Sequence, residues 1–278
     1  MSAPESAGLA AASVAFIGAG KMGSALLAGL LRGERPGRVL VVEPNASAEA
    51  QALCKEGGFQ LCANVPSDAA PVDALVLAIK PQMLEDAAPA LKPLIGPDTL
   101  VVSILAGKRV ADLATRLPAR AFVRSMPNTP AAIGRGVTGA FANAPTSEAR
   151  RALAQALLGA AGAVEWVERE ELIDAVTAVS GSGPAYVFYL AECLAAAGVA
   201  AGLPKDLSMR LARATVSGAG ELMHRSPETE PGKLRENVTS PGGTTAAALG
   251  VLMAEDGLKP LLERAVAAAQ RRAEELSG

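Results

Sequence analysis

Short apolar runs alternate with helical segments through the first 168 residues of this 278-residue chain. Strands that are apolar on both faces are typical of a parallel sheet covered by helices on each side. We therefore expect an α/β domain over residues 1–168. Its strands are predicted at residues 14–17, 39–42, 74–79, 100–104, 121–124 and 137–141, and its main helices at residues 22–32, 46–56, 84–94 and 110–117.

From residue 169 onward the sequence shows helical spacing and no convincing strand. Clusters of glycine, proline and serine are expected to separate the helices at residues 181–184, 202–204, 227–232 and 240–243. We therefore predict an all-α domain over residues 169–278, joined to the first domain without a low-complexity linker.

One helix of this second domain has no polar face. Residues 185–202 carry a single charge, Glu192, and their length approaches the ~20 residues that a membrane span needs. The stretch is rich in alanine and glycine, and no cluster of lysine or arginine flanks it, which disfavours a span. We expect a soluble helix that is buried on all sides inside an oligomer.

Composition excludes several classes of function. The net charge is −2 and aromatic residues make up 3% of the chain, so neither a basic face nor a base-stacking platform for nucleic acid is expected. Three cysteines without a CxxC spacing, and an acidic N-terminal start, favour a reduced, cytoplasmic protein without a signal peptide. The only histidine, His224, leaves no basis for a metal site or a Ser-His-Asp hydrolase.

A complete GxGxxG motif, Gly18, Gly20 and Gly23, follows the first predicted strand and opens a helix. In a dinucleotide site the first glycine makes the tight turn, the second admits the pyrophosphate, and the third packs helix on strand. Glu43 stands twenty positions after Gly23, at the end of the second strand. A carboxylate there favours the ribose 2′-hydroxyl of NADH and repels the 2′-phosphate of NADPH. Polar groups at residues 44–47 keep NADPH open as the alternative.

Other strand ends are candidates for the same site, because ligands bind at the carboxyl edge of such sheets. Lys80 either lines the cofactor or is an exposed loop lysine. Ser103 and Ala106 end the next strand with small residues that let a cofactor approach the backbone. Asn128, between Pro127 and Pro130, either holds the nicotinamide amide or belongs to a plain turn.

Two clusters of glycine, serine and threonine mark the helical half, at residues 174–186 and 237–245. Each places free amides and hydroxyls at a helix N-terminus, which binds a small anion without lysine or arginine. Each is equally well explained as a helix cap.

The segments IGAGKMG, AIKP, RSMPNTP, DAVTAVSGSGPAYVF and VTSPGGTTAA, in this order, resemble the pyrroline-5-carboxylate reductase family over nearly the whole chain. The resemblance implies a Rossmann-type domain followed by an all-α dimerisation domain, assembled as intertwined dimers or larger homo-oligomers. It implies reduction of 1-pyrroline-5-carboxylate to L-proline with NADPH or NADH, the last step of proline biosynthesis. Glu43 departs from the family, in which a small polar residue is common.

The resemblance also implies roles for individual residues. Thr244 and Thr245, after the Gly242-Gly243 turn, fall where the family holds the substrate carboxylate. Thr177 falls near the reacting ring, and Glu170 matches a position linked to the product amine. We take Thr177 and Thr245 as the catalytic candidates. The residues expected to contact the cofactor on this basis are Ile17, Gly18, Ala19, Gly20, Lys21, Met22, Asn64, Ala78, Ile79, Lys80, Pro81, Ser103, Ala106 and Asn237.

Two other interpretations remain open. A β-hydroxyacid-dehydrogenase-like oxidoreductase shares the two-domain plan but needs a catalytic lysine in its helical half, where Lys205, Lys233 and Lys259 have surface contexts. A non-catalytic dinucleotide-binding or pyridoxal-phosphate-type regulatory protein would not need an intact anion-binding loop beside an intact GxGxxG motif.

Overall fold

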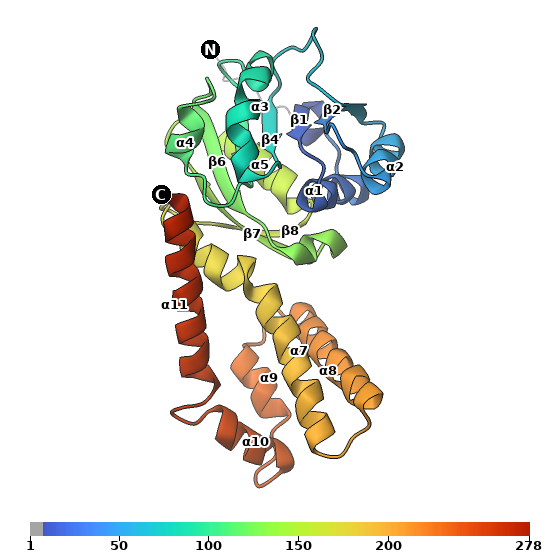
Figure 1. The fold of residues 1–278 in the computed structure, drawn as a ribbon, viewed down its shortest axis with the longest axis vertical. Coiled ribbons are helices and arrows are strands. Elements are labelled where there is room, and N and C mark those ends of the chain that lie inside the picture. Colours follow the sequence, from blue (N-terminus) through green and yellow to red (C-terminus); the bar gives the residue numbers. More distant parts are fainter. Residues whose placement is uncertain (1–7) are drawn as a thin grey trace. The chain divides into compact units, whose positions relative to one another are not determined.

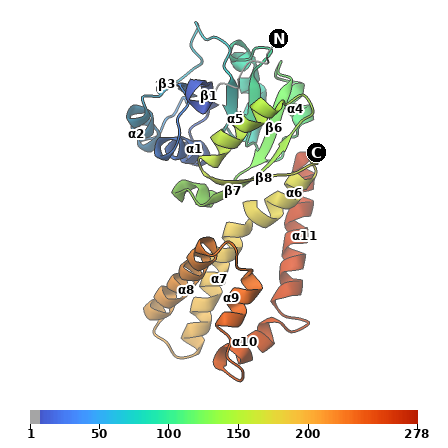
Figure 2. The same cartoon turned by 180° about the vertical axis from the view of Figure 1, so that it is seen from behind.

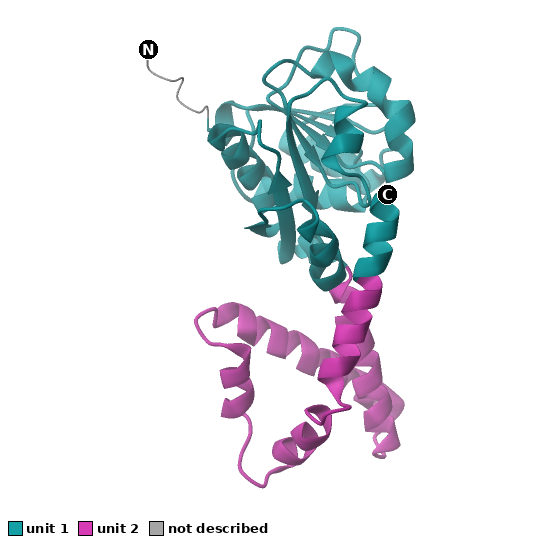
Figure 3. Ribbon diagram, turned by 90° about the vertical axis from the view of Figure 1, so that its left-hand side faces the viewer, with its two compact units in different colours: residues 1–181, 270–278 teal, residues 182–269 magenta. Residues whose placement is uncertain are grey.

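The structure is a computed structural model that describes residues 8–278. It divides into two compact units, coloured separately in Figure 3: Met1–Gly181 with Gln270–Gly278, and Ser182–Ala269. This division differs from the boundary expected at residue 168. The first unit extends further because the helical segment that follows its last strand packs on β6 and β7, and because the chain re-enters this unit at its end.

The first unit is built on one eight-stranded sheet in the order β3-β2-β1-β4-β5-β6-β7-β8 (Figure 1). Strands β1 to β6 are parallel to one another, which confirms the Rossmann-type α/β fold. The bounds are β1 Ser13–Ile17, β2 Arg38–Val42, β3 Gln60–Cys62, β4 Ala74–Leu77, β5 Leu100–Ser103, β6 Ala121–Met126, β7 Gly136–Ala142 and β8 Gly162–Trp166.

Two expectations about this sheet were wrong. It is not wholly parallel, because β7 runs antiparallel to β6. Only a short segment with the 3-10 helix Thr129–Ile133 joins these strands, and a parallel return needs a crossover of a dozen or more residues. Strands β3 and β8 were not predicted. β3 has three residues, and β8 alternates exposed and half-buried residues, so neither gives a strong apolar signal.

Helices cover both faces of the sheet (Figures 1 and 2). Alternate strand residues such as Phe16 and Val41 pack with α1, α2 and α5, while their neighbours Ile17 and Leu40 pack with α3 and α4. Because both faces are covered, the central strands are apolar at nearly every position. The helix bounds are α1 Lys21–Arg32, α2 Ala48–Gly57, α3 Leu84–Leu91, α4 Val110–Ala114 and α5 Glu148–Gly159.

The rest of the chain is helical, and Ser182–Ala269 contains no strand. The expected breaks at 202–204, 227–232 and 240–243 are present, whereas the break at 181–184 is only a bend at Ser182. There the chain passes from α6 through a π-helical turn, η5, into α7. The bounds are α6 Leu172–Val176, η5 Thr177–Gly181, α7 Gly183–Ala200, α8 Lys205–Arg225, α9 Pro231–Asn237, α10 Thr244–Leu252 and α11 Leu258–Ser277.

Small residues bring α7 and α8 close together. The Ser208 hydroxyl donates to the Ala195 carbonyl at 2.6 Å, and a Cβ on Gly198 would collide with the same hydroxyl. Away from α8, large apolar side chains of α7 are uncovered: the exposed fraction is 62% for Phe188 and 50% for Leu190. A single chain therefore does not bury this helix on all sides, and its burial inside an oligomer stays a prediction.

The helical stretch Leu172–Ala200 is long and apolar enough to cross a membrane by length and composition alone. Its mean hydropathy is 1.3, and 6% of its best window is buried. Core helices of soluble proteins pass the same test, so one such helix is weak evidence for a membrane span. In a single chain the apolar face of α7 is left without a covering surface.

The contact between α1 and α5 gives a sharp test of packing in the first unit. A Cβ on Gly29 of α1 would collide with the Ala160 carbonyl at the end of α5, and a backbone atom cannot move aside cheaply. We expect Gly29→Ala to lower the free energy of unfolding by about 2 kcal/mol, and Tm by several degrees. Gly159→Ala is the matched control, since nothing lies within 4 Å of its added Cβ. Equal Tm values for the two variants, measured by calorimetry, would contradict this packing.

Candidate dinucleotide and substrate site

The order of the strands creates a crevice at one edge of the sheet. From β1 the chain moves outward to β2 and β3, then returns to the other side of β1 with β4, β5 and β6. The loops after β1 and β4 therefore run in opposite directions. Ligands of such sheets bind in the crevice between these two loops. All predicted cofactor residues of the first unit lie on β1 or in segments at the carboxyl ends of β1 to β6.

The three glycines of the first loop have three different surroundings. Gly18 has φ +96°, and a Cβ there would lie 2.6 Å from the Ala78 carbonyl oxygen. Gly23 packs α1 against the loop, since its Cβ would lie 2.5 Å from the Gly18 carbonyl. Gly20 has nothing within 4 Å of an added Cβ. The geometry thus matches the turn, the open approach and the tight packing that the motif predicted.

The helix that follows Gly20 offers amides to an anion. Its first bond runs from the Ser24 amide to the Gly20 carbonyl at 2.8 Å. The amides of Lys21, Met22 and Gly23 precede that bond and have no intrahelical acceptor. Free amides of this kind, together with the helix dipole, favour a phosphate group, so this helix start stays the candidate for the pyrophosphate. The buried Ser24 hydroxyl donates to the Ala19 carbonyl at 2.9 Å and fixes the loop from below.

Glu43 is joined to the glycine-rich loop. Its carboxylate accepts from the Ala19 amide at 2.9 Å and from the Asn45 amide at 3.0 Å. The side chain is half-buried, so its oxygens are held in place at the end of β2. Asn64 is exposed beyond the end of β3, and the Glu43 amide donates to the Cys62 carbonyl at 2.9 Å. The structure thereby places both residues predicted for the ribose on neighbouring strand ends.

The loops after β4 and β5 differ in what they expose. Ala78 and Ile79 are half-buried beneath the glycine-rich loop, and Lys80 is exposed where it caps the 3-10 helix Pro81–Met83. Ala106 is exposed. Ser103, by contrast, is fully buried, and its hydroxyl accepts from the Leu105 amide at 3.2 Å. This arrangement favours a role for Ser103 in shaping its loop over a side-chain contact to a cofactor.

Asn128 joins the loop after β6 to the π-helical turn. Its Nδ2 donates to the Ser180 carbonyl at 3.1 Å, and its Oδ1 accepts from the Val137 amide at 2.9 Å. The side chain is 8% exposed. These bonds favour a structural role for Asn128 over direct binding of the nicotinamide amide.

Thr177 and Glu170, predicted for the substrate, both lie in the first unit. Thr177 opens the π-helical turn, and its hydroxyl donates to the Ile173 carbonyl at 2.7 Å. Glu170 Oε1 accepts from the Val110 amide at 2.7 Å and lies 3.5 Å from Arg124. The carboxylate of Glu170 is therefore engaged by the protein itself, which favours a positioning role over contact with the product amine.

The second predicted anion loop lies in the other unit, between α9 and α10. Asn237 ends α9, Gly242 has φ +70°, and Gly243 caps α10. The amides of Thr244, Thr245 and Ala246 open α10, where no intrahelical carbonyl is available. Within residues 8–278 neither threonine hydroxyl forms a hydrogen bond, and Thr245 is half-buried. Free amides and unbonded hydroxyls are groups that a small carboxylate can accept hydrogen bonds from, so the loop stays the candidate for the substrate carboxylate.

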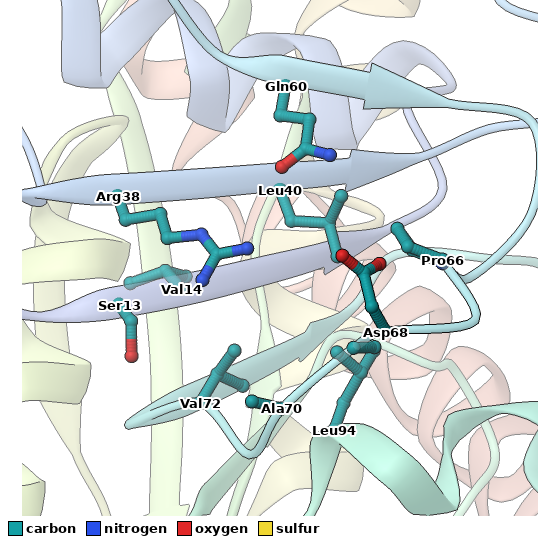
Figure 4. A pocket seen from close by; sticks show the side chains of 11 residues that line it. Ser13, Val14, Arg38, Leu40, Gln60, Pro66, Asp68, Ala70, Val72 and Leu94 are labelled. Carbon is teal, nitrogen blue, oxygen red and sulfur yellow. The ribbon is translucent and has the colours of Figure 1, made fainter.

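Other candidate groups do not form a site. Figure 4 shows a pocket at the opposite edge of the sheet, where Ser13, Arg38 and Gln60 begin their strands; its volume of about 40 Å³ is far too small for a dinucleotide. No group of three metal-binding side chains occurs among the described residues. Burial raises the pKa of the Cys54 thiol, which lies inside α2, away from the carboxyl edge.

The lysines required by the β-hydroxyacid-dehydrogenase interpretation are on the surface. Lys233 is 63% exposed and pairs with Glu236, and Lys259 is 85% exposed. Lys205 is exposed at the start of α8. The geometry therefore disfavours this alternative.

The charged cluster around Arg124 in β6 was not predicted from the sequence. Arg124 is 2% exposed and pairs with the buried Asp174 at 2.9 Å. A signal was present, because an arginine inside an otherwise apolar strand needs a buried partner. What the sequence could not indicate is which acid that partner is, since Asp174 is fifty positions away.

The fold and the glycine-rich loop define a dinucleotide-binding oxidoreductase that also carries a helical module, Ser182–Ala269. Family comparisons agree: residues 13–107 match the family described as "NADP oxidoreductase coenzyme F420-dependent", and residues 170–276 match "Pyrroline-5-carboxylate reductase dimerisation". Two curated relatives carry the name pyrroline-5-carboxylate reductase. That from Pseudomonas aeruginosa is 41% identical over 95% of this chain and 96% of its own length, and that from Pisum sativum is 37% identical over 95% and 96%.

Solved structures give the same result. A pyrroline-5-carboxylate reductase from Coxiella burnetii is 33% identical, covers 96% of this chain and 99% of its own, and has a TM-score of 0.88. A Plasmodium falciparum pyrroline carboxylate reductase with NADP bound is 27% identical, with coverage of 98% and 100% and a TM-score of 0.78. The chain belongs to the pyrroline-5-carboxylate reductase family, which confirms the resemblance noted from its motifs.

The fixed carboxylate of Glu43 generates a prediction about cofactor choice. A 2′-phosphate near this charge is disfavoured by about 1–4 kcal/mol, so Glu43→Ser should raise the NADPH:NADH ratio of kcat/KM by about fivefold or more. Glu49→Ser is the control, since Glu49 is an exposed acid in the first turn of α2 with no bond to the loop. Parallel steady-state assays measure the ratio. An unchanged ratio in Glu43→Ser would mean that Glu43 does not contact the ribose.

Proposed function

We propose that this protein reduces 1-pyrroline-5-carboxylate to L-proline with NAD(P)H, as the last step of proline biosynthesis. The observation that carries the proposal is the presence of two glycine-led helix starts with free amides in one chain. One follows the open Gly20 and suits a dinucleotide, and the other follows Gly242-Gly243 and suits a carboxylate. Relatives of this name that align over 95% of the chain support the same activity.

The chemistry needs positioning more than strong acid or base catalysis. NAD(P)H, when bound, supplies the hydride that reduces the imine carbon. The nitrogen must carry a proton, and the resulting iminium is electrophilic enough to accept hydride when it is held beside the donor. The residues near the proposed site fit this requirement, since they are amides, hydroxyls and small side chains.

We assign the tasks as follows. The amides at the start of α1 bind the pyrophosphate, and Glu43 binds the adenosine ribose. The amides that open α10, with the Thr245 hydroxyl, bind the substrate carboxylate. The proton of the Thr177 hydroxyl is committed to the Ile173 carbonyl, so its lone pairs are available to accept the N–H of the iminium or of the product amine. Thr177 thus orients the ring and is not its proton donor.

A direct assay tests the proposal. Imine reduction is followed with NADH and NADPH in parallel, together with proline-dependent reduction of NAD(P)⁺ at high pH. Turnover in both directions is expected. Turnover of a β-hydroxyacid instead of the imine, or dinucleotide binding without turnover of either, would overturn it.

Thr245 gives the prediction for the carboxylate site. Thr245→Ala removes one hydrogen bond to a charged group, worth about 1.5–3 kcal/mol, so kcat/KM for the imine should fall about 10- to 100-fold. NAD(P)H binding, measured by fluorescence titration, should be nearly unchanged. Thr245→Ser keeps the hydroxyl and should cost much less. If Thr245→Ala weakened NAD(P)H binding as much as it lowered kcat/KM for the imine, the loop would be only a helix cap and not the carboxylate site.

We also propose that the functional protein is an intertwined homodimer or larger homo-oligomer in the cytoplasm. The exposed apolar side chains of α7 call for a partner surface, and the family match of residues 170–276 concerns dimerisation. A second copy covers the face without requiring a membrane or nucleic acid.

Light scattering tests this assembly. The protein, purified without detergent, should have the molar mass of a dimer or a multiple of it at micromolar concentration. Phe188→Asp should lower that mass, because a carboxylate in an apolar interface is costly. Ile133→Asp is the control, since Ile133 is 75% exposed in the first unit, outside the helical module. A stable, active monomer of the unmodified protein would rule the proposal out.

A further inference from the structure

A buried guanidinium lies in the middle of the first unit. Arg124 projects from β6 and is 2% exposed. Its Nη2 donates to Asp174 Oδ1 at 2.9 Å and to the Ser277 hydroxyl at 3.2 Å. The Ser277 hydroxyl in turn donates to Asp174 Oδ1 at 3.0 Å, and Glu170 lies 3.5 Å from Arg124 Nη1.

Stability alone does not account for this cluster. Removing two charges from water costs several kcal/mol each, and apolar residues of similar volume at such positions are often as stable or more so. A buried ion pair does fix geometry, because only one arrangement satisfies both charges. What matters is therefore which segments the cluster fixes.

The first of these segments is the turn that carries Thr177. Asp174 lies in α6, three positions before Thr177, and binds β6 through Arg124. Val176 fits against β7 only because Gly139 has no side chain there. At the far end of the turn, Asn128 binds the Ser180 carbonyl. A π-helical turn is rare and frequent at functional sites, and this one is held at both ends by residues of β6 and the loop after it.

The second segment is the last turn of α11. Ser277 is 5% exposed and binds both partners of the ion pair. Beside it, the Leu276 carbonyl packs on Gly107, which has φ +69° and whose Cβ would lie 2.6 Å from that oxygen. Gly107 follows Ala106 in the loop after β5. The segments by which the chain leaves and re-enters the first unit, residues 170–181 and 270–278, thus meet at one guanidinium.

We propose that Arg124, with Asp174 and Ser277, is a positioning residue for imine reduction. It holds the Thr177 turn and the end of α11 in one fixed arrangement at the carboxyl edge of the sheet. This inference rests on the proposed function, because it concerns the placement of Thr177. Arg124 touches neither substrate nor cofactor in this scheme.

The test uses variants that remove the buried ion pair without leaving either of its charges unpaired; Glu170, whose side chain is 19% exposed, keeps its bond from the Val110 amide. Arg124→Met with Asp174→Leu replaces the pair by apolar residues, and Ser277→Ala removes one hydroxyl. Arg150→Met is the control, because Arg150 pairs with Asp98 on the surface, where Asp98 is 98% exposed. Steady-state kinetics are combined with hydrogen–deuterium exchange of residues 174–181 and 270–278 in the full-length protein.

We expect the double variant to remain folded and to lose about 10- to 100-fold in kcat, since small misplacements of reacting groups have effects of this size. KM for NAD(P)H should stay within about twofold, and exchange should rise in both segments. Ser277→Ala should show the same pattern at smaller amplitude, and Arg150→Met none of it.

A folded double variant with wild-type kcat would overturn the inference, as would a loss of kcat while the 174–181 amides remain protected. A parallel rise in KM for NAD(P)H would also overturn it, by indicating general destabilisation. If the double variant does not fold, Ser277→Ala decides by the same criteria. Failure of the unmodified protein to reduce the imine is a separate result. It refutes the proposed function and, with it, the catalytic part of the inference. Hydrogen–deuterium exchange still reports whether Arg124 joins the two segments.

Discussion

In a parallel sheet each connection must carry the chain back before the next strand begins, so all strands end at the same edge. Strands β1 to β6 obey this rule. The consequence is that loops far apart in sequence, from Gly18 to Asn128, converge without any direct signal between them. The dinucleotide site follows from that convergence together with the absence of side chains at three glycines. Gly18 and Gly23 allow close packing, and Gly20 leaves room.

The helical module depends on small residues in a different way. Gly198 and Ser208 let α7 and α8 pack tightly, which leaves the larger side chains of α7, such as Phe188, on the outside. A helix with this distribution is incomplete in a single chain. The same module carries the free amides at the start of α10, which we propose as the site of the substrate carboxylate. The apolar face and the proposed carboxylate site thus belong to one small set of helices.

Polar side chains inside the first unit hold its loops and its two chain ends in position. Glu43 binds the Ala19 amide, Asn128 binds the π-helical turn, and Arg124 binds Asp174 and Ser277. From the sequence, Glu43 and Asn128 were candidate cofactor ligands, and Arg124 was overlooked. In the structure all three side chains bond to the protein, and Glu43 is still the residue that we propose for the ribose. They fix the loops that surround the proposed site.

The sequence by itself determined the Rossmann-type domain, the helical second half, the glycine-rich loop and the loop before α10. These features depend on local patterns: continuous apolar strands, helix breaks, and glycines at a fixed spacing. The sequence also identified the family, because each of its motifs is a continuous segment that can be recognised without the fold. The tertiary structure decided the rest. The antiparallel return of β7 follows from a connection too short for a crossover, and β3 and β8 are strands because a neighbour supplies their hydrogen bonds. The buried location of Ser103 and the pairing of Arg124 with Asp174 and Ser277 depend on residues brought together from distant positions. No local pattern encodes such a contact, because its energy exists only once the strands and helices have packed.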